Sequence, residues 1–463
     1  MNSIQRSTGG VASALLLLAA PISFAPQAVQ AQQPLSGQPA PVRLTLGEAA
    51  RLAAHQNAVA QGAQLRTEQA RARVTQRRAE LLPNVSASAL QSGRTFNTVT
   101  FGITFPTPPG QAPFFNPKGQ VEGPVNTIDL RGRVQTNLFD YGALQRVRSA
   151  QVAVGAASAD AENAAEQAAT QAVSAYLRAL RSDAQLQARI ADSTLATELL
   201  GISRSQLQAG VGVGLDVTRA RSQLAGVHTQ LIVARNERDR ARLDLHRALN
   251  LPLETPMVLA DSLSDVVTDE LTFDEQAATQ RALRDRPDIR AAEEQLRAAR
   301  QSLSAIRSER LPSVSAFGDD GVIGKDLSRV LPTYTYGIQL SVPIFDGFRR
   351  EGRIEEQSAV ARELDVRRRD LEQQAAIEVR GALLDLASAR QAVDAARERL
   401  ALADQEVAQA RERFRAGVAG NADVVTASLS LNGARSQYVD ALTALQSARV
   451  TLARAEGAIT QLR

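Results

Sequence analysis

The chain contains one tandem duplication, and this feature constrains its fold more than any other. Four short motifs occur twice, in the same order, along 463 residues. The paired segments are 44–46 with 271–273, 80–87 with 309–316, 138–140 with 344–346, and 208–217 with 415–424. Motifs that recur in order indicate two copies of one structural unit. The first copy alone carries a Pro- and Phe-rich stretch, residues 101–124, which we expect to form a long loop.

The N-terminus has the pattern of an export signal. Arg6 precedes a short apolar run at 11–20, and small residues at 29–31 resemble a cleavage site. The run is too short for a membrane-spanning helix, which needs about 20 apolar residues, and an N-terminal anchor is the alternative. The chain contains no Cys, which excludes disulfides and lipid attachment through a cysteine. We therefore predict a signal peptide at 1–31 and structural repeats at 32–260 and 261–463.

The positions of the prolines predict two very long helices. No proline lies between Pro124 and Pro252, and none follows Pro343. Helices can therefore run unbroken from about 150 to 209 and from about 351 to 416. At about 1.5 Å per residue, these helices are rods of roughly 90–100 Å.

Each copy follows the same predicted plan. A short helical segment comes first, at 46–80 in one copy and at 273–309 in the other, and a Leu-Pro motif ends it. Two strand-like segments, the long helix, a Gly-containing turn and a shorter helix follow. Together, the two shorter helices of a copy are about as long as the long one, so we expect them to stack end to end beside it.

The second long helix carries a heptad repeat. Large apolar residues recur at every seventh position: Val379, Leu386, Val393, Leu400, Val407 and Phe414. An alanine follows three residues after each of the first five. A large residue at one core position and alanine at the other predict a close coiled-coil seam. In the first copy, Arg189 and Ser193 interrupt this pattern.

Two segments, at 128–138 and 334–344, alternate between apolar and polar residues. Their length, about 10–11 residues, is what a tilted strand needs to cross a bilayer. One face of each is apolar and is expected to meet lipid. The other face carries candidate lumen-facing residues: Asp129, Arg131, Arg133 and Gln339. A half-exposed sheet in a soluble protein is the alternative.

Partner strands with weaker alternation are expected from Val85 and Val314, which makes four strands in the chain. Open strand edges are not tolerated in lipid, and single-chain membrane barrels have at least about eight strands. Several copies must therefore combine their strands. Three copies of four strands would supply 12.

The composition excludes several other functions. A formal net charge of +4, with Arg interleaved with acidic residues, indicates solvated helix surfaces, and we expect no nucleic-acid partner. The three His residues are scattered, and the chain has neither Cys nor a phosphate-binding loop motif. We therefore expect no catalytic, metal or cofactor site and no enzymatic activity.

These motifs together resemble the outer-membrane efflux protein family, the TolC-like channels. The similarity covers residues 44–459. Three features, each found twice, carry it: Leu-Pro before the first strand, Phe-Asp at the strand-to-helix junction, and Ala-Gly followed six residues later by Asp-Val. The resemblance implies a mainly α-helical protein with a transmembrane β part. It implies a homotrimer with a 12-stranded outer-membrane β-barrel and a 12-helix periplasmic α-barrel, docked to a periplasmic adaptor (membrane fusion protein) and an inner-membrane pump.

The resemblance also implies roles for residues at the helix turns. It places Gly210 and Gly417 in turns at the periplasmic tip, where the adaptor docks. It assigns Asp423, with Asp216 as its counterpart in the first copy, to a ring of carboxylates at the narrowest aperture. Such a ring would favour cations. Alternatively, Asp423 only caps the N-terminus of the last helix.

The chain departs from the family pattern at this aperture. Thr426 stands where a second Asp is expected. Phe414 and Ala419 stand where Tyr and Arg would hold the tip shut. We therefore expect closure to depend on packing of Phe414 at the end of the heptad seam and on Asp423.

The sequence thus predicts a passive outer-membrane duct, with a long periplasmic extension, for a tripartite efflux or type I secretion system. A periplasmic adaptor or an elongated structural coiled coil is the alternative. An adaptor would have one helical hairpin between soluble β domains, and a structural coiled coil would need no alternating strands. Nothing in the chain indicates whether the cargo is a drug, a metal or a protein.

Overall fold

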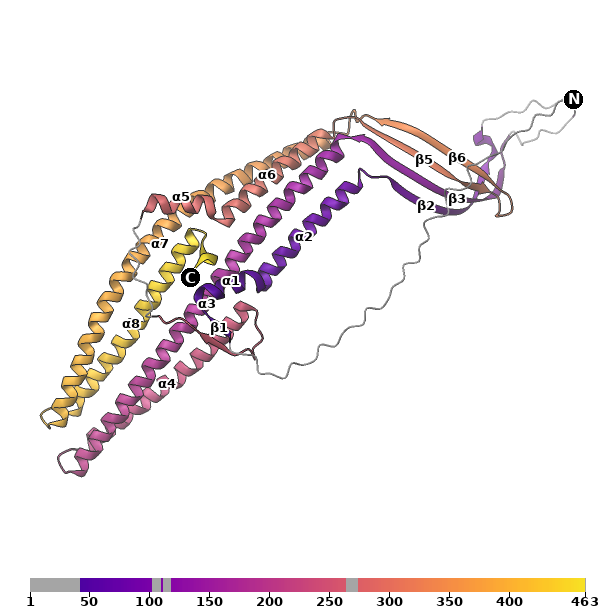
Figure 1. Ribbon diagram of the computed structural model, residues 1–463. Helices are drawn as coiled ribbons and strands as arrows, with labels where there is room; N and C mark the ends of the chain where they lie inside the picture. The colour runs from indigo at the N-terminus through magenta and orange to yellow at the C-terminus, as the bar shows by residue number, and fades with distance from the viewer. Residues whose placement is uncertain (1–41, 102–109, 111–117, 264–273, 463) are drawn as a thin grey trace. The chain divides into compact units, whose positions relative to one another are not determined.

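A computed structural model describes residues 42–101, 110, 118–263 and 274–462. The predicted signal peptide, the motif at 271–273 and most of the predicted loop at 101–124 lie outside these residues. The first elements in the chain are β1 (Val42–Leu44), α1 (Leu46–Gln56), α2 (Ala58–Ala79), β2 (Asn84–Asn97), η1 (Thr98–Phe101), β3 (Val121–Asp140), α3 (Tyr141–Gln208) and α4 (Gly214–Leu249). They are followed by β4 (Met257–Leu259), α5 (Glu275–Asp285), α6 (Pro287–Ser308), β5 (Ser313–Gly324), β6 (Val330–Ser341), α7 (Arg349–Arg415), α8 (Asn421–Ala455) and η2 (Ile459–Gln461). Figure 1 shows β2, β3, β5 and β6 at one end of the long helices and the two interhelical turns at the other.

The two predicted long helices are present, α3 with 68 residues and α7 with 67. At about 1.5 Å per residue, each is roughly 100 Å long. α3 begins earlier than the sequence indicated because Asp140 caps it. Oδ1 of Asp140 accepts a hydrogen bond from the backbone N of Ala143 at 2.9 Å, which satisfies one of the free donors at the helix start.

Each predicted short helix is in fact two helices, so the prediction of continuous segments at 46–80 and 273–309 was wrong. In the first repeat the break lies at Asn57. The Asn57 side chain accepts from Val59 N at 2.9 Å and donates to Ala248 O at 2.9 Å. The first bond caps α2, and the second ties the break to α4, a contact that the local sequence does not reveal.

In the second repeat the break lies at Arg286, directly before Pro287. A residue before proline disfavours the helical conformation, so the sequence did contain this signal. The Arg286 side chain is buried and pairs with Asp288 at 2.7 Å and with Glu378 of α7 at 2.6 Å. Burial opposes ionisation of Asp288, but the hydrogen bonds from Arg286 outweigh it, and the pKa of Asp288 is lowered.

The helices form a layer whose order follows from their contacts. Beside the strands, α3 packs against α2 and α6, and α6 packs against α7. Toward the turns, α3 packs against α4 and α8, and α8 packs against α7. The layer therefore has α2 and α4 at one edge and α7 at the other, as Figure 1 illustrates. As predicted, the shorter helices of each repeat pack along its long helix. In the first repeat α1, α2 and α4 contact α3, and in the second repeat α5, α6 and α8 contact α7.

The predicted heptad seam of α7 forms a core. Val379 and Leu386 are fully buried, and Val393, Val407 and Phe414 are nearly so. The alanines of the seam at 382, 389, 396 and 403 are buried as well. The seam packs against α8. Its residues from Leu386 to Ala396 also belong to a buried cluster that includes Tyr176 of α3. Small residues at one core position let the helices approach closely, as the sequence indicated.

The four strands form one antiparallel sheet in the order β2-β3-β5-β6. β3 has 20 residues and begins at Val121, so the end of the predicted loop at 101–124 is a strand. β6 ends at Ser341, so the last residues of the alternating segment at 334–344 lie beyond it. The repeats meet in the middle of this sheet, where β3 pairs with β5.

A two-stranded parallel ribbon, β1 with β4, joins the beginning of the first repeat to its end. Tyr176 of α3 lies beneath it, with Oη 2.8 Å from Leu44 O and 3.0 Å from Asp261 Oδ2. Leu46 N donates to the same carboxylate at 2.6 Å. Burial raises the pKa of Tyr176.

Candidate functional site

The two interhelical turns have the same backbone structure. Gly210 has a φ of 73° and Gly417 a φ of 71°, conformations that L side chains rarely adopt. In the first turn, Val211 N donates to Gln206 O at 3.1 Å. In the second, Val418 N donates to Arg413 O at 2.9 Å. Glycine in this conformation reverses the chain at a helix end, so both predicted tip glycines are required by their turns.

The two aspartates assigned to the aperture occupy equivalent positions. Asp216 is the third residue of α4, and Asp423 is the third residue of α8. Neither side chain makes a capping hydrogen bond, so the alternative in which Asp423 caps α8 is wrong; Gly420 is the N-cap residue there. Asp423 is exposed, while Asp216 lies 3.9 Å from Arg219. A free carboxylate in the first turn is favoured by the helix dipole.

Phe414 is only 3% exposed and packs in a cluster that includes Leu199 of α3 and Val424 of α8. Phe414 therefore packs the two hairpins, α3–α4 and α7–α8, against each other. Two hydrogen bonds reinforce this packing. Gln206 Nε2 donates to Phe414 O at 2.8 Å, and the buried Asn421 donates from Nδ2 to Asp216 O at 2.8 Å.

Charged residues also link the hairpins. Glu198 of α3 pairs with Arg411 and Arg415 of α7, the latter at 2.8 Å. Sequence reasoning missed Glu198, since its partners lie on the other repeat. These ion pairs connect the hairpins through the stretch of α7 that contains Phe414. Thr426 donates to Ala422 O within its own helix at 2.9 Å and makes no such link.

A second polar link is buried deeper between α3 and α8. The Asp192 side chain is fully buried and pairs with Arg189 at 3.1 Å and Arg435 at 2.9 Å. Arg189 also donates from Nη2 to Ser436 Oγ at 2.8 Å. The sequence showed Arg189 only as an interruption of the seam, whereas in the structure it belongs to a paired network.

The predicted lumen-facing residues share one face of the sheet. Asp129, Arg131 and Arg133 alternate along β3, and residues two apart in a strand point to the same side. Arg131 pairs with Asp129 at 3.2 Å and with Asp319 of β5. Gln339 of β6 lies on this face as well, since it pairs in register through β5 to β3.

Arg133 differs from Arg131 in that it is exposed and makes no ion pair or side-chain hydrogen bond within the described residues. The opposite face of the sheet is mostly apolar, with Asp320 of β5 as a charged exception. Tyr336 is 80% exposed and Ile338 is 73% exposed there, so none of the described residues covers these side chains. The strands therefore present charge on one side and uncovered apolar surface on the other.

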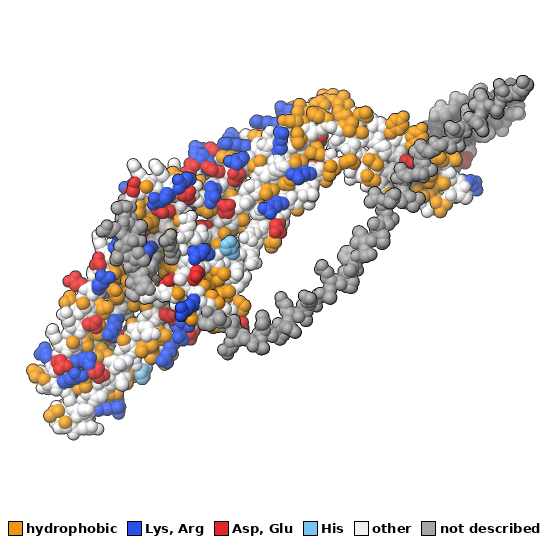
Figure 2. Space-filling view, in the orientation of Figure 1, with side chains coloured by type: hydrophobic (Ala, Val, Ile, Leu, Met, Phe, Trp, Pro, Cys, Tyr) orange, Lys and Arg blue, Asp and Glu red, His pale blue; other side chains and the backbone are white. Residues whose placement is uncertain are grey.

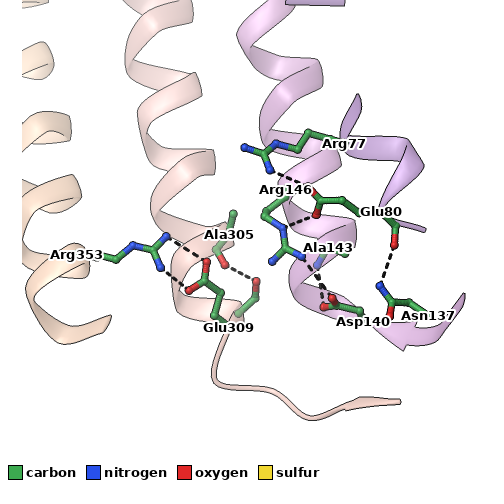
Figure 3. Close-up of polar contacts among 10 residues, drawn as sticks. Arg77, Glu80, Asn137, Asp140, Ala143, Arg146, Ala305, Glu309 and Arg353 are labelled. Atoms are coloured by element: carbon green, nitrogen blue, oxygen red, sulfur yellow. Dashed lines mark hydrogen bonds and ion pairs between the residues drawn. The ribbon is translucent and has the colours of Figure 1, made fainter. Parts of the chain in front are cut away.

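The junction between strands and helices is held by a cluster of polar contacts, shown in Figure 3. Arg146 of α3 pairs with Glu80 at 2.8 Å and with Asp140 at 3.4 Å, and Arg77 pairs with Glu80 at 2.7 Å. Asn137 of β3 donates from Nδ2 to Glu80 O at 2.8 Å. Burial opposes ionisation of Glu80, but the hydrogen bonds from the two arginines outweigh it and lower its pKa. The cluster fixes the angle at which β3 enters α3.

The second repeat has a related junction. Glu309, which follows α6, pairs with Arg353 of α7 at 2.7 Å, as Figure 3 also shows. Arg310 pairs with Glu351 at 3.1 Å. Glu80 and Glu309 are equivalent residues in the repeated Leu-Pro motif. The motif therefore ends a helix and also supplies the carboxylate that pairs with the following long helix.

In the part of the chain that the structure describes, no helix is long and apolar enough to cross a membrane. The same residues include no group of three or more His, Cys, Asp or Glu placed to hold a metal ion.

Comparison with known proteins agrees with these features. The family model described as outer membrane efflux protein matches residues 50–251 and 278–458. The probable efflux pump outer membrane protein SepC of Pseudomonas putida is 26% identical over 253 residues, 53% of this chain and 51% of SepC. The alkaline protease secretion protein AprF of Pseudomonas aeruginosa is 25% identical over 277 residues, 58% of this chain and 54% of AprF. The chain thus spans about half the length of these relatives.

The fold is that of solved outer-membrane channels. The structure of the outer-membrane channel OprN has a TM-score of 0.72 and 20% identity, and the similarity covers 90% of this chain and 91% of OprN. The matched family model covers most of both repeats, including both interhelical turns and both strand-to-helix junctions. The chain therefore belongs to the outer membrane efflux protein family and is a protein of the outer membrane.

Proposed function

We propose that three copies of this chain form a passive duct through the outer membrane. The four-stranded sheet carries this proposal. Within the described residues, β2 and β6 each pair on one side only, and the apolar face is uncovered. Unpaired edges are not tolerated in lipid, so strands of further copies must continue the sheet. Three copies would close a 12-stranded barrel with the face of Arg131 and Gln339 toward water.

The helical layer supports the same assembly. Four helices, α2, α3, α6 and α7, form the layer beside the strands, so three copies would make a 12-helix wall. Exposed apolar residues lie on the edge helices: Ile377 (72%) and Leu384 (66%) on α7, and Ile232 (66%) on α4. Contact between neighbouring copies would remove these side chains from water, which stabilises the assembly.

The aperture is proposed at the helix turns. Three copies of Asp423 around one axis would concentrate negative charge and favour cations, and Asp216 would contribute less because Arg219 lies beside it. Closure would depend on the buried Phe414 and on the pairs of Glu198 with Arg411 and Arg415, which hold the hairpins together.

The proposed partners are a periplasmic adaptor and an inner-membrane pump, docked at the turns of Gly210 and Gly417. The exposed Val211 (81%) and Val418 (73%) beside these glycines offer apolar contacts for such a partner. The duct itself would have no enzymatic activity and no cofactor. SepC is named for efflux and AprF for protease secretion, so this wall suits either cargo and the pump would select it. We also propose that residues 1–31 are a signal peptide and that the two structural repeats comprise residues 32–260 and 261–463.

Planar-bilayer recording of the purified protein, together with its mass in detergent, tests the duct and the aperture. The expected result is a trimer with a small, cation-selective conductance. Asp423→Ala should raise the conductance and weaken cation selectivity, while Asp440→Ala, on the same helix but far from the turn, should change neither. A monomer that gives no conductance would reject the duct and favour a periplasmic adaptor or a structural coiled coil. A conducting trimer that Asp423→Ala leaves unchanged would retain the duct and reject the aperture.

A further inference from the structure

At the strand-to-helix junction, two faces of the helical layer differ in chemistry. One face forms a groove of about 890 Å³ lined by α2, α3, α6 and α7, with polar and charged residues including Gln76, Arg146 and Glu309. Residues two apart on a helix point to nearly opposite sides. Arg78, Arg148 and Arg307 each lie two positions from a groove-lining residue, so they project from the opposite face of the layer.

Each of these arginines is exposed and has an exposed leucine four residues away in the chain, on the side nearer the strands: Leu82 (61%), Leu144 (37%) and Leu311 (47%). Leu144 and Arg148 are both in α3, so they lie on the same side of that helix. Leu82 and Leu311 follow the ends of α2 and α6. We name these six residues the junction collar. Figure 2 shows hydrophobic side chains gathered where the helices meet the strands, with Lys and Arg side chains on the adjoining helical turns.

The collar arginines have no partner within the described residues. Arg77, Arg146 and Arg353 at the same junction all form ion pairs with Glu80 or Glu309. Arg78, Arg148 and Arg307 form no ion pair or side-chain hydrogen bond in the part of the chain that the structure describes. The groove-face arginines nearest the strands are therefore paired, while the collar face has free guanidinium groups at the same level.

The arrangement of apolar and charged residues matches a membrane interface. The collar leucines lie at the junction with strands whose apolar side chains are uncovered. Phe345 and Phe348, which follow β6, are 73% and 70% exposed and pack edge to face against each other. Apolar and aromatic side chains at the lipid boundary, followed by arginines just outside it, are typical of chains anchored at the level of the headgroups. Guanidinium groups bind phosphate through paired hydrogen bonds.

We propose that the junction collar binds the headgroup phosphates of anionic phospholipids in the periplasmic leaflet of the outer membrane. This inference rests on the proposed barrel, because it requires the apolar strand face to meet lipid. Arg148 and Arg307 carry it, since α3 and α6 lie inside the helical layer and a neighbouring copy would not cover them. Arg78 on the edge helix α2 extends the same row.

Native mass spectrometry of the trimer, released from nanodiscs of phosphatidylcholine with phosphatidylglycerol, tests the collar. We expect the wild-type protein to retain phosphatidylglycerol in preference to phosphatidylcholine. In Arg148→Gln/Arg307→Gln this preference should fall by roughly an order of magnitude, since a cationic side chain at a membrane surface is worth about fivefold in binding. Arg148→Lys/Arg307→Lys should retain most of it.

A matched control removes two charges from the opposite face. Arg66 and Arg73 line the groove and are exposed, so Arg66→Gln/Arg73→Gln should leave the lipid preference unchanged. Equal retention of both lipids by the wild-type protein, or equal effects of the two double variants, would overturn the collar. Bilayer conductance of each variant separates this outcome from failure of the duct, because a trimer that conducts without a lipid preference rejects only the collar.

Discussion

Arg435 of α8 donates from Nη1 to Oδ1 of Asp192 in α3 at 2.9 Å, and this ion pair joins the two repeats inside the helical layer. Arg189 pairs with the same carboxylate at 3.1 Å, and Asp404 of α7, 3.6 Å from Arg435, balances the second positive charge. Buried carboxylates need such partners, because an isolated charge removed from water is costly. The network therefore sets the position of one hairpin relative to the other.

Asp192→Ala should destabilise the protein by about 1–3 kcal/mol, because the partly buried Arg189 and Arg435 lose their hydrogen bonds to a buried carboxylate. Loss of the helical circular dichroism signal with denaturant measures this change. The control is Asp440→Ala. Asp440 also pairs across the repeats, with Arg181 at 2.9 Å, but both side chains are about half exposed. Its removal should cost less than about 1 kcal/mol. Equal costs for the two variants would contradict a structural role for burial at Asp192.

Glu198→Gln should loosen the hairpins near their turns, because the neutral amide loses the charge interaction with Arg411 and Arg415. We expect a larger mean conductance or more frequent open periods in planar bilayers. Glu412→Gln is the control, since Glu412 pairs with Arg415 within α7 and does not connect the hairpins. Similar traces from Glu198→Gln and wild type would show that the ion pairs of Glu198 do not keep the hairpins together.

Gly417→Ala should destabilise the second turn by about 1–2 kcal/mol, although nothing lies within 4 Å of the added methyl group. The cost comes from the φ of 71°, which an alanine rarely adopts. Gly226→Ala offers a contrast on α4. Its added methyl also meets nothing within 4 Å, but a helix interior favours alanine by about 0.5–1 kcal/mol. Thermal unfolding should therefore move in opposite directions in the two variants.

The junction at Glu80 should make stability depend on pH. Because its pKa is lowered in the folded protein, Glu80 contributes stability above the unfolded pKa of about 4.3, and this is lost as the pH falls through the folded value. Glu80→Gln should cost about 1 kcal/mol at neutral pH, since the pairs are partly exposed. The difference from wild type should vanish in acid. A difference that persists below the lowered pKa would assign the effect to packing and not to charge.

Much of the fold could be read from the residues in order. The absence of proline after Pro124 and Pro343 predicted both long helices, and the heptads of α7 predicted its buried seam. The periodicity of the sequence predicts these helices because each pattern extends over many turns, and a buried residue recurs in every heptad. It failed at Asn57, where a hydrogen bond to Ala248 in a distant helix breaks the expected segment.

The candidate site shows the same division. Gly210 and Gly417 were predictable because a left-handed residue at a helix end calls for glycine in any context. The partners of Glu198, Asp192 and Arg131 were not, since each lies on the other repeat or on a distant residue of the sheet. Charged residues on helices are common, and no sequence pattern separates a solvated arginine from a paired one.

The duplication, the order of the long helices and of the four sheet strands, and the apolar face of those strands follow from local periodicity, proline and glycine. The way in which the two copies join does not follow from these patterns: β3 lies beside β5, α3 beside α8, and Asp192 between two arginines. Such pairings depend on which surfaces meet in space. Residues far apart in the chain leave no periodic signal of that meeting.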